Sequence, residues 1–213
     1  MKIGIIGSGA VARSLAGGFL AHGHNVMMGT RHQGKLDDWR AANPKAAVGS
    51  FADAAASADV IVLAVKGAVA ADALRLAGVA NLDGKVVIDT TNPIAEGPPD
   101  HGVLKYFTSL NDSLMERLQR DFPGARFVKA FNSVGNAFMV NPQFTGGTPT
   151  MFICGNHDAA KWVVKGILEQ FGWDTEDLGS VEAARAIEPL CILWCIPGFL
   201  RNQWSHAFKL LKA

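Results

Sequence analysis

The sequence is poor in cysteine and in grouped metal ligands. Its 213 residues include three cysteines, Cys154, Cys191 and Cys195, an odd number without a C-x-x-C pair. Cys191 and Cys195 are one helical turn apart on an apolar segment, where buried free thiols are expected rather than a disulfide or metal ligands. The six histidines are scattered and show no metal-ligand spacing. We therefore expect no metal site.

Charge of one sign and long hydrophobic runs are also missing. The net charge is +1 without a basic run, which argues against a nucleic acid as the main partner. No stretch approaches the roughly 18 uninterrupted apolar residues of a membrane span. Gly4, Gly7, Gly9 and Arg13 interrupt the apolar start, so it lacks the apolar region of a signal peptide. We expect a cytoplasmic protein without a membrane span.

The chain opens with an apolar strand that breaks into a glycine turn and then a helix. Gly7 allows the tight turn, and Gly9 has no Cβ, so the backbone can approach a pyrophosphate. Ala12 is small enough for the helix to pack on the strand, and the helix N-terminus offers unpaired N–H groups to phosphates. The G-x-G-x-x-A pattern alone is weak evidence, but here it follows a strand and precedes a helix, as the motif requires. It predicts a dinucleotide-binding site.

The end of the second expected strand favours one cofactor. NAD sites usually place an acidic residue there to bind the ribose 2′-hydroxyl, whereas this chain has Thr30, Arg31 and Lys35. A carboxylate would repel a 2′-phosphate, and an arginine can bind it with two hydrogen bonds. We therefore predict NADP(H). The alternative is that Arg31 and Lys35 are only solvated loop residues.

Strands and helices alternate along the whole chain, which is typical of a parallel sheet with crossover helices. We predict a doubly wound, Rossmann-type α/β fold with a mainly parallel sheet. Residues 1–213 are expected to form a single dinucleotide-binding domain, completed by a C-terminal helical segment at 181–213. This segment is expected to be helical to about residue 209 and to bend or break at Pro189 and Pro197. The loop at 95–110 is long enough to be functional.

No loop at an expected strand end offers a nucleophile–base pair of the Ser–His or Cys–His kind. His101 is the one histidine of the long loop, and we do not expect it to be catalytic. The simplest chemistry without such groups is direct hydride transfer between two bound ring compounds, which needs positioning and exclusion of water more than a protein acid. We predict no catalytic side chain.

Several segments together resemble the deazaflavin-dependent NADP oxidoreductases, the NADPH:coenzyme F420 reductase family. The same fold serves as the cytosolic reductase domain of the STEAP ferric reductases. The resemblance covers nearly the whole chain and is most specific at Val128-Lys129-Ala130-Phe131-Asn132-Ser133-Val134; the other matching segments include 5–9, 29–31 and 89–93. Pyrroline-carboxylate and imine reductases are similar over the first hundred residues, but the 33 residues after Ser180 cannot supply their large helical dimerisation domain.

The resemblance implies a role for each loop at a strand end. After the turn at Gly7, the pyrophosphate would be contacted by Ser8, Gly9, Ala10 and Val11. The 2′-phosphate would be held by Thr30, Arg31 and Lys35. The ribose and nicotinamide would lie beside Val65 and Lys66. Asn92 and Pro93 would lie close to the nicotinamide ring. The pocket for the second ring would be bordered by Asn132, Ser133 and Val134.

The identity of the small-molecule acceptor stays open. The resemblance implies the deazaflavin coenzyme F420, and a flavin, a quinone or another small electrophile are alternatives. A different interpretation is a non-catalytic NADPH-binding sensor or regulatory protein. A third is a small imine or carbonyl reductase, which would need a proton donor near the nicotinamide.

The C-terminal segment also predicts a homodimer. Residues 189–200 carry no charge and are apolar nearly all round, whereas a surface helix shows one apolar stripe. A symmetric partner would cover part of this helix, with Trp194 and Phe199 at the interface. The alternative is that the segment packs inside its own subunit or forms a wall of the acceptor pocket.

Overall fold

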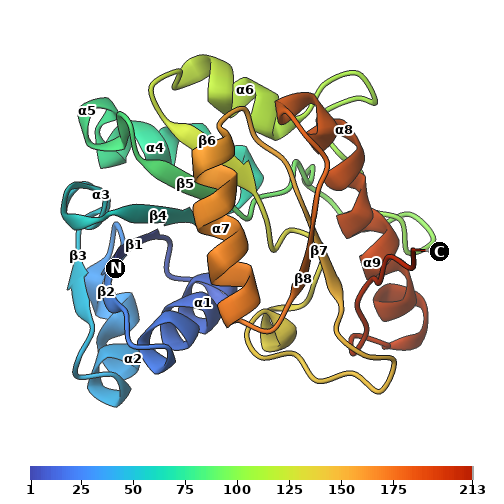
Figure 1. Ribbon diagram of the computed structural model, residues 1–213, viewed down its shortest axis with the longest axis horizontal. Helices are drawn as coiled ribbons and strands as arrows, with labels where there is room; N and C mark the ends of the chain where they lie inside the picture. The colour runs from blue at the N-terminus through green and yellow to red at the C-terminus, as the bar shows by residue number, and fades with distance from the viewer. Residues whose placement is uncertain (213) are drawn as a thin grey trace.

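The computed structural model describes residues 1–212, and its centre is a six-stranded sheet with helices on both faces (Figure 1). All strands of this sheet run parallel, in the order β3-β2-β1-β4-β5-β6. The bounds are β1 (Lys2–Ile6), β2 (Asn25–Gly29), β3 (Ala47–Gly49), β4 (Val60–Leu63), β5 (Val86–Asp89) and β6 (Arg126–Lys129). The predicted doubly wound Rossmann-type fold is confirmed.

Helices connect successive strands. Between β1 and β4 these are α1 (Ala10–Ala21), the 3₁₀ helix η1 (Gln33–Leu36), α2 (Asp37–Ala42) and α3 (Phe51–Ser57). Between β4 and β6 they are η2 (Gly67–Val69), α4 (Ala70–Ala77), α5 (Val79–Leu82) and α6 (Leu114–Asp121).

Alternate side chains of the strands enter two separate cores. In β4, Val60 and Val62 belong to one core and Ile61 and Leu63 to the other, and all four are buried. The first core is covered by α1 and α7 (Asp158–Gln170), and the second by α3, α4 and α6. Because both faces are covered, the central strand β4 is a continuous apolar run, VIVL, without polar alternation.

After β6 the chain builds a smaller sheet beside the first. The 3₁₀ helix η3 (Asn136–Phe138) leads to β7 (Thr150–Ile153), which pairs in parallel with β8 (Asp174–Asp177) across α7. An antiparallel bridge between Lys129 and Cys154 joins the two sheets. The second sheet is therefore anchored to the end of β6.

The C-terminal segment is helical but ends earlier than expected. The 3₁₀ helix η4 (Val181–Ala183), α8 (Ala184–Ile187) and α9 (Pro189–Arg201) follow one another, and α9 continues through Pro197. A proline removes one backbone donor from a helix, whereas the left-handed backbone of Asn202, with φ of 52°, ends it as an αL cap. The helix is therefore not broken at Pro197, and the prediction that it continues to residue 209 was wrong.

Residues 202–212 fold back along α9 and reach β7. The indole Nε1 of Trp194 donates to the carbonyl of His206 at 2.8 Å, and the amide of Thr150 donates to the carbonyl of Phe208 at 2.8 Å. Trp194 is consequently 7% exposed in its own subunit. Because this tail covers Trp194, little of its side chain is left for the predicted dimer interface, which stays a prediction.

One helical stretch, Val181–Arg201, is long and apolar enough to cross a membrane by length and composition. The buried helix of a globular domain meets the same criterion. Here Glu188, near the middle of the stretch, is 1% exposed and lies 3.0 Å from the ammonium of Lys129 at the end of β6. In this structure the stretch therefore packs on the sheet.

The long loop before α6 is an irregular hairpin. Antiparallel bridges join Ile94 to Tyr106 and Asp100 to Val103. A Cβ at Gly102 would lie 2.9 Å from Cγ of Leu200 in α9, so the hairpin packs closely on the C-terminal helix. The sequence had indicated only a loop of unusual length.

Candidate dinucleotide-binding site

The predicted site residues all lie at one edge of the main sheet. Because the strands are parallel, the loops after β1, β2, β4, β5 and β6 emerge at the same edge. The strand order reverses between β1 and β4, since β2 and β3 lie on one side and β5 and β6 on the other. Ligands of open α/β sheets bind in the crevice at such a reversal.

The glycine turn after β1 has the geometry that a phosphate site needs. Gly7 has φ of 143°, and a Cβ there would lie 2.2 Å from the carbonyl oxygen of Ala64, so other residues are excluded. Gly9 precedes α1, and a Cβ on it would meet no atom within 4 Å. No side chain of the described residues caps α1. The N–H groups at the start of α1 therefore lie beside open space, which fits a pyrophosphate.

The loop after β2 leaves its two cations available. Arg31 and Lys35 are exposed, and neither side chain makes an ion pair or hydrogen bond with the side chains and backbone that the structure describes. Thr30 is 5% exposed, and its hydroxyl accepts a hydrogen bond from the amide of His32 at 3.2 Å. Thr30 therefore shapes the loop, and the charge that faces solvent comes from Arg31 and Lys35.

Arg13 of α1 joins these two loops. Its guanidinium donates to the carbonyl of Ser8 at 3.1 Å and to the carbonyl of Lys35 at 2.5 Å. The 3₁₀ turn at Lys35 is thereby held close to the glycine turn. Sequence reasoning did not assign Arg13 to the site, because nothing local indicates which carbonyls a helix arginine will reach.

The loops after β4 and β5 pack tightly against each other. A Cβ at Gly67 would lie 2.1 Å from the carbonyl oxygen of Asn92, so glycine is required for this contact. Val65 is half-buried, Lys66 is exposed, and Pro93 is buried. The Asn92 side chain lies partly open at this edge.

The loop after β6 supports the loop after β5. The Nδ2 of Asn92 donates to the backbone carbonyl of Asn132 at 2.8 Å, and the Nδ2 of Asn132 donates to Oδ1 of Asn92 at 3.2 Å. Phe131 has a left-handed backbone with φ of 61°, a strain of about 1–3 kcal/mol for such a residue. Asn132, Ser133 and Val134 are 4%, 7% and 7% exposed. Asn132 therefore mainly holds Asn92.

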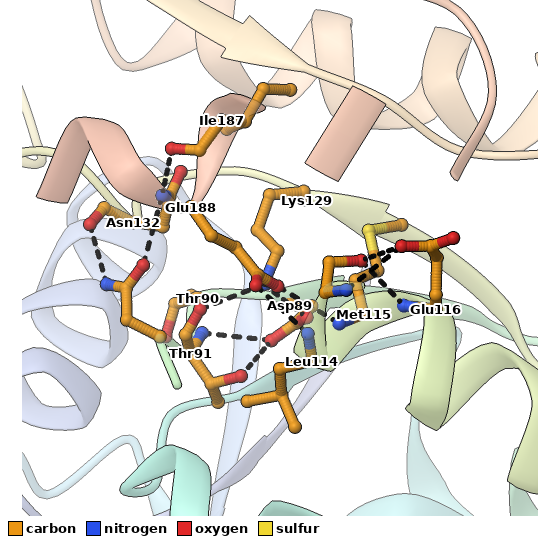
Figure 2. Close-up of polar contacts among 12 residues, drawn as sticks. Asp89, Thr90, Thr91, Leu114, Met115, Glu116, Lys129, Asn132, Ile187 and Glu188 are labelled. Atoms are coloured by element: carbon orange, nitrogen blue, oxygen red, sulfur yellow. Dashed lines mark hydrogen bonds and ion pairs between the residues drawn. The ribbon is translucent and has the colours of Figure 1, made fainter. Parts of the chain in front are cut away.

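A buried charge cluster lies beneath these loops (Figure 2). The ammonium of Lys129 is 2.6 Å from Oδ2 of Asp89 and 3.0 Å from Oε1 of Glu188, and it donates to the carbonyl of Thr91 at 2.8 Å. The side chains of Lys129 and Asp89 are fully buried, and that of Glu188 is 2% exposed.

The cluster keeps Lys129 charged and supplies extra donors to Glu188. Burial by itself lowers the pKa of Lys129, but the charges and hydrogen bonds of Asp89 and Glu188 outweigh it, and the pKa is raised above its ordinary value. The amides of Leu114 and Met115 at the start of α6 each donate to the Glu188 carboxylate at 3.0 Å. Helix N-termini favour such anions.

Sequence reasoning missed this cluster. Asp89 and Lys129 are charges at the ends of buried strands, and Glu188 directly precedes the uncharged run of α9. Charged residues at such positions could have indicated a buried ion pair, since buried charges are paired in folded proteins. The pairing itself joins residues that are distant in the sequence. No group of three or more metal-binding side chains occurs among residues 1–212.

Comparison with known proteins places the chain in a family. A model of NADP oxidoreductases described as coenzyme F420-dependent matches residues 2–93. A crystal structure from Arthrobacter sp. FB24, provisionally named an F420-dependent NADP reductase, covers 100% of both chains at 35% identity, with a TM-score of 0.92. An imine reductase from Streptomyces aurantiacus, at 15% identity and a TM-score of 0.68, shows the fold alone.

Two longer proteins are also related. Rat metalloreductase STEAP3 is 31% identical over 212 residues, which cover 93% of this chain and 39% of the rat protein. Human metalloreductase STEAP2 is 28% identical over 89% of this chain and 36% of its own length. The chain thus spans less than half of these curated relatives.

The fold, the family model and the Arthrobacter structure place the chain among the NADP-dependent oxidoreductases. More narrowly, the chain belongs to the coenzyme F420-dependent NADP oxidoreductase family. This confirms the resemblance noted in the sequence.

Proposed function

We propose that this enzyme transfers a hydride directly between NADP(H) and a second ring compound, with the deazaflavin coenzyme F420 as the acceptor best supported by the family. The observation that carries the cofactor assignment is the loop after β2, where Arg31 and Lys35 are exposed and unpaired among the described residues. A 2′-phosphate would find two cations there, next to an uncapped helix N-terminus.

The cofactor would lie across the strand reversal. The pyrophosphate would bind the amides at Ser8, Gly9, Ala10 and Val11, and the adenosine half would extend over β2 towards Arg31. The nicotinamide half would then lie over β4 and β5, since a dinucleotide spans the two halves of such a sheet. Val65, Lys66, Asn92 and Pro93 would border it, with Asn132, Ser133 and Val134 supporting the floor of the second ring's pocket.

The chemistry requires little from the protein besides position. The nicotinamide C4–H bond breaks, the hydride forms a new bond to the acceptor ring, NADPH becomes NADP⁺, and the acceptor takes up a proton from solvent. The buried charges beneath these loops, Asp89 and Lys129, are paired with each other, so we expect neither to act as an acid or a base. This favours a ring acceptor over an imine or a carbonyl, whose reduction calls for a placed proton donor.

The test is anaerobic oxidation of NADPH with coenzyme F420, FMN, FAD and a quinone side by side. We expect turnover with coenzyme F420 and a strong preference for NADPH over NADH. If the enzyme oxidises NADPH with a flavin or a quinone but not with coenzyme F420, the proposed hydride transfer stands and the proposed acceptor is wrong. Tight NADPH binding without oxidation by any acceptor would refute the enzymatic proposal in favour of a sensor.

We also propose that the chain works as a homodimer of single domains, each completed by 181–213. One side of α9, with Cys191, Trp194 and Gly198, is buried in its own subunit. Leu193, Phe199 and Leu200 are 55%, 44% and 54% exposed. A symmetric partner would cover these side chains, which is what supports the dimer; the cytoplasmic location expected from the sequence stays a prediction.

A further inference from the structure

The buried charges belong to a closed ring of contacts that passes through the nicotinamide side of the crevice. We name this set the polar ring; its members are Asp89, Thr91, Asn92, Lys129, Asn132 and Glu188. Figure 2 labels five of the six members: Asp89 and Thr91 at the end of β5, Lys129 and Asn132 at the end of β6, and Glu188 at the junction of α8 with α9. Its members are joined by hydrogen bonds and ion pairs, and by two steps along the chain, from Thr91 to Asn92 and from Ile187 to Glu188.

The ring holds Thr91 at three atoms. Oδ1 of Asp89 accepts from the Thr91 amide at 2.9 Å and from its hydroxyl at 2.7 Å. The Lys129 ammonium donates to the Thr91 carbonyl at 2.8 Å. Asn92, the next residue, then has little freedom, because Gly67 packs against its carbonyl and Asn132 binds its side chain.

The ring closes through the C-terminal helices. The Nδ2 of Asn132 also donates to the carbonyl of Ile187 at 2.9 Å, and the next residue, Glu188, returns to Lys129. The Tyr106 hydroxyl donates to the backbone carbonyl of Glu188 at 2.7 Å. Displacement of α8 and α9 would therefore reach Asn92 by two routes, through Asn132 and through Lys129.

Stability alone does not explain such a cluster. Replacing buried ion pairs with well-packed apolar residues is often neutral or stabilising, because removing charges from water is costly. A network of buried hydrogen bonds and ion pairs does, however, favour one arrangement of its side chains. Hydride transfer needs this property, since a displacement of about 1 Å can cost about a hundredfold in rate.

We propose that Thr91, Lys129 and Glu188 are positioning residues that set Asn92 against the nicotinamide and make hydride transfer depend on the C-terminal helices. This rests on the proposed function. The 2′-phosphate and pyrophosphate loops lie on the other side of the strand reversal and take no part in the ring. Loss of the ring should therefore slow hydride transfer and leave NADPH affinity nearly unchanged.

The test compares two neighbouring threonines. Thr91→Val removes one hydrogen bond of the ring while keeping the side-chain shape. Thr90→Val is the matched control, because the Thr90 hydroxyl is also buried but donates to the carbonyl of Leu63 at 2.9 Å, outside the ring. Glu188→Gln provides a second ring variant of nearly unchanged volume and carries the test if Thr91→Val does not fold.

Two quantities are measured in the full chain. They are the NADPH dissociation constant, from nicotinamide fluorescence, and the single-turnover rate constant with whichever acceptor the wild type reduces. We expect the rate constant to fall at least about tenfold in Thr91→Val and Glu188→Gln, with the dissociation constant within about threefold. Thr90→Val should change both by less than about threefold.

Equal effects in Thr91→Val and Thr90→Val, or rate losses that only follow losses of melting temperature, would overturn the proposal. If the wild type oxidises no NADPH, the proposed function fails, and the positioning proposal is then judged by the limiting fluorescence of bound NADPH. A changed emission at unchanged affinity in the ring variants alone would support it. Unchanged emission would refute it.

Discussion

Arg31 allows the cofactor assignment to be tested with one substitution. The residue follows β2, is exposed, and makes no ion pair within the described chain. Arg31→Ala should therefore leave the fold intact, because exposed substitutions away from packed or paired groups usually change stability by less than about 0.5 kcal/mol. What it removes is a guanidinium available to a 2′-phosphate.

The size of the effect follows from the kind of bond that is lost. A hydrogen bond to a charged group contributes about 1.5–3 kcal/mol, which corresponds to roughly a ten- to hundredfold loss of affinity. NADH has no 2′-phosphate, so its binding should be almost unchanged. Because the site is exposed, the NADPH effect should also shrink at high salt.

Titration of nicotinamide fluorescence with NADPH and NADH, for the wild type and Arg31→Ala, measures this selectivity. Arg40→Ala serves as a control, because Arg40 is an exposed arginine of α2 whose charge lies 4.0 Å from Asp37. We expect Arg40→Ala to preserve the preference for NADPH. Equal losses for both cofactors in Arg31→Ala, or none for either, would show that another group recognises the 2′-phosphate.

Three further predictions concern the turn, the charge cluster and the dimer. Gly9→Ala should keep the wild-type urea midpoint, because its Cβ would meet only open space, and it should weaken NADPH binding, because that space is where the pyrophosphate would lie. Gly7→Ala should lower the urea midpoint, since its Cβ would lie 2.2 Å from the Ala64 carbonyl oxygen. Equal urea midpoints of the two variants would contradict this. Lys129→Met should lower the free energy of unfolding by about 3–5 kcal/mol by leaving buried carboxylates unpaired. The pKa of Lys129 is raised in the folded state, so the stabilisation that the Lys129 charge provides should be complete below its unfolded pKa of 10.5 and decline only at higher pH. Urea titrations of the wild type and Lys129→Met across pH measure this. A difference in unfolding free energy that is already lost near pH 7 would refute a charged Lys129 in the cluster. In sedimentation experiments the wild type should be a dimer and Phe199→Glu a monomer. Trp162→Glu, on the exposed face of α7, is the control and should stay a dimer. A wild type that sediments as a monomer would disprove the dimer.

Local pattern was enough to predict the fold and one half of the site. The apolar runs of β4 and β5, the glycine turn at Gly7 and the acid-free end of β2 each carry their information within a few consecutive residues. Their positions follow directly, because parallel strands with crossover helices bring all carboxyl ends to one edge. The α/β class, the edge of the sheet that carries the candidate site and the two cations after β2 were therefore available from the sequence.

Long-range packing determined the other half. Nothing near Glu188 indicates that it meets Lys129 and the first amides of α6, and nothing near Trp194 indicates that residues 202–212 cover it. Sequence periodicity reports which face of an element is apolar, but it does not report which distant element covers that face. The sequence by itself thus determined the sheet and the glycine turn after its first strand. The tertiary structure alone decided how the C-terminal helices are connected to the loop at Thr91 and Asn92, because the connecting contacts join residues 38 to 82 positions apart.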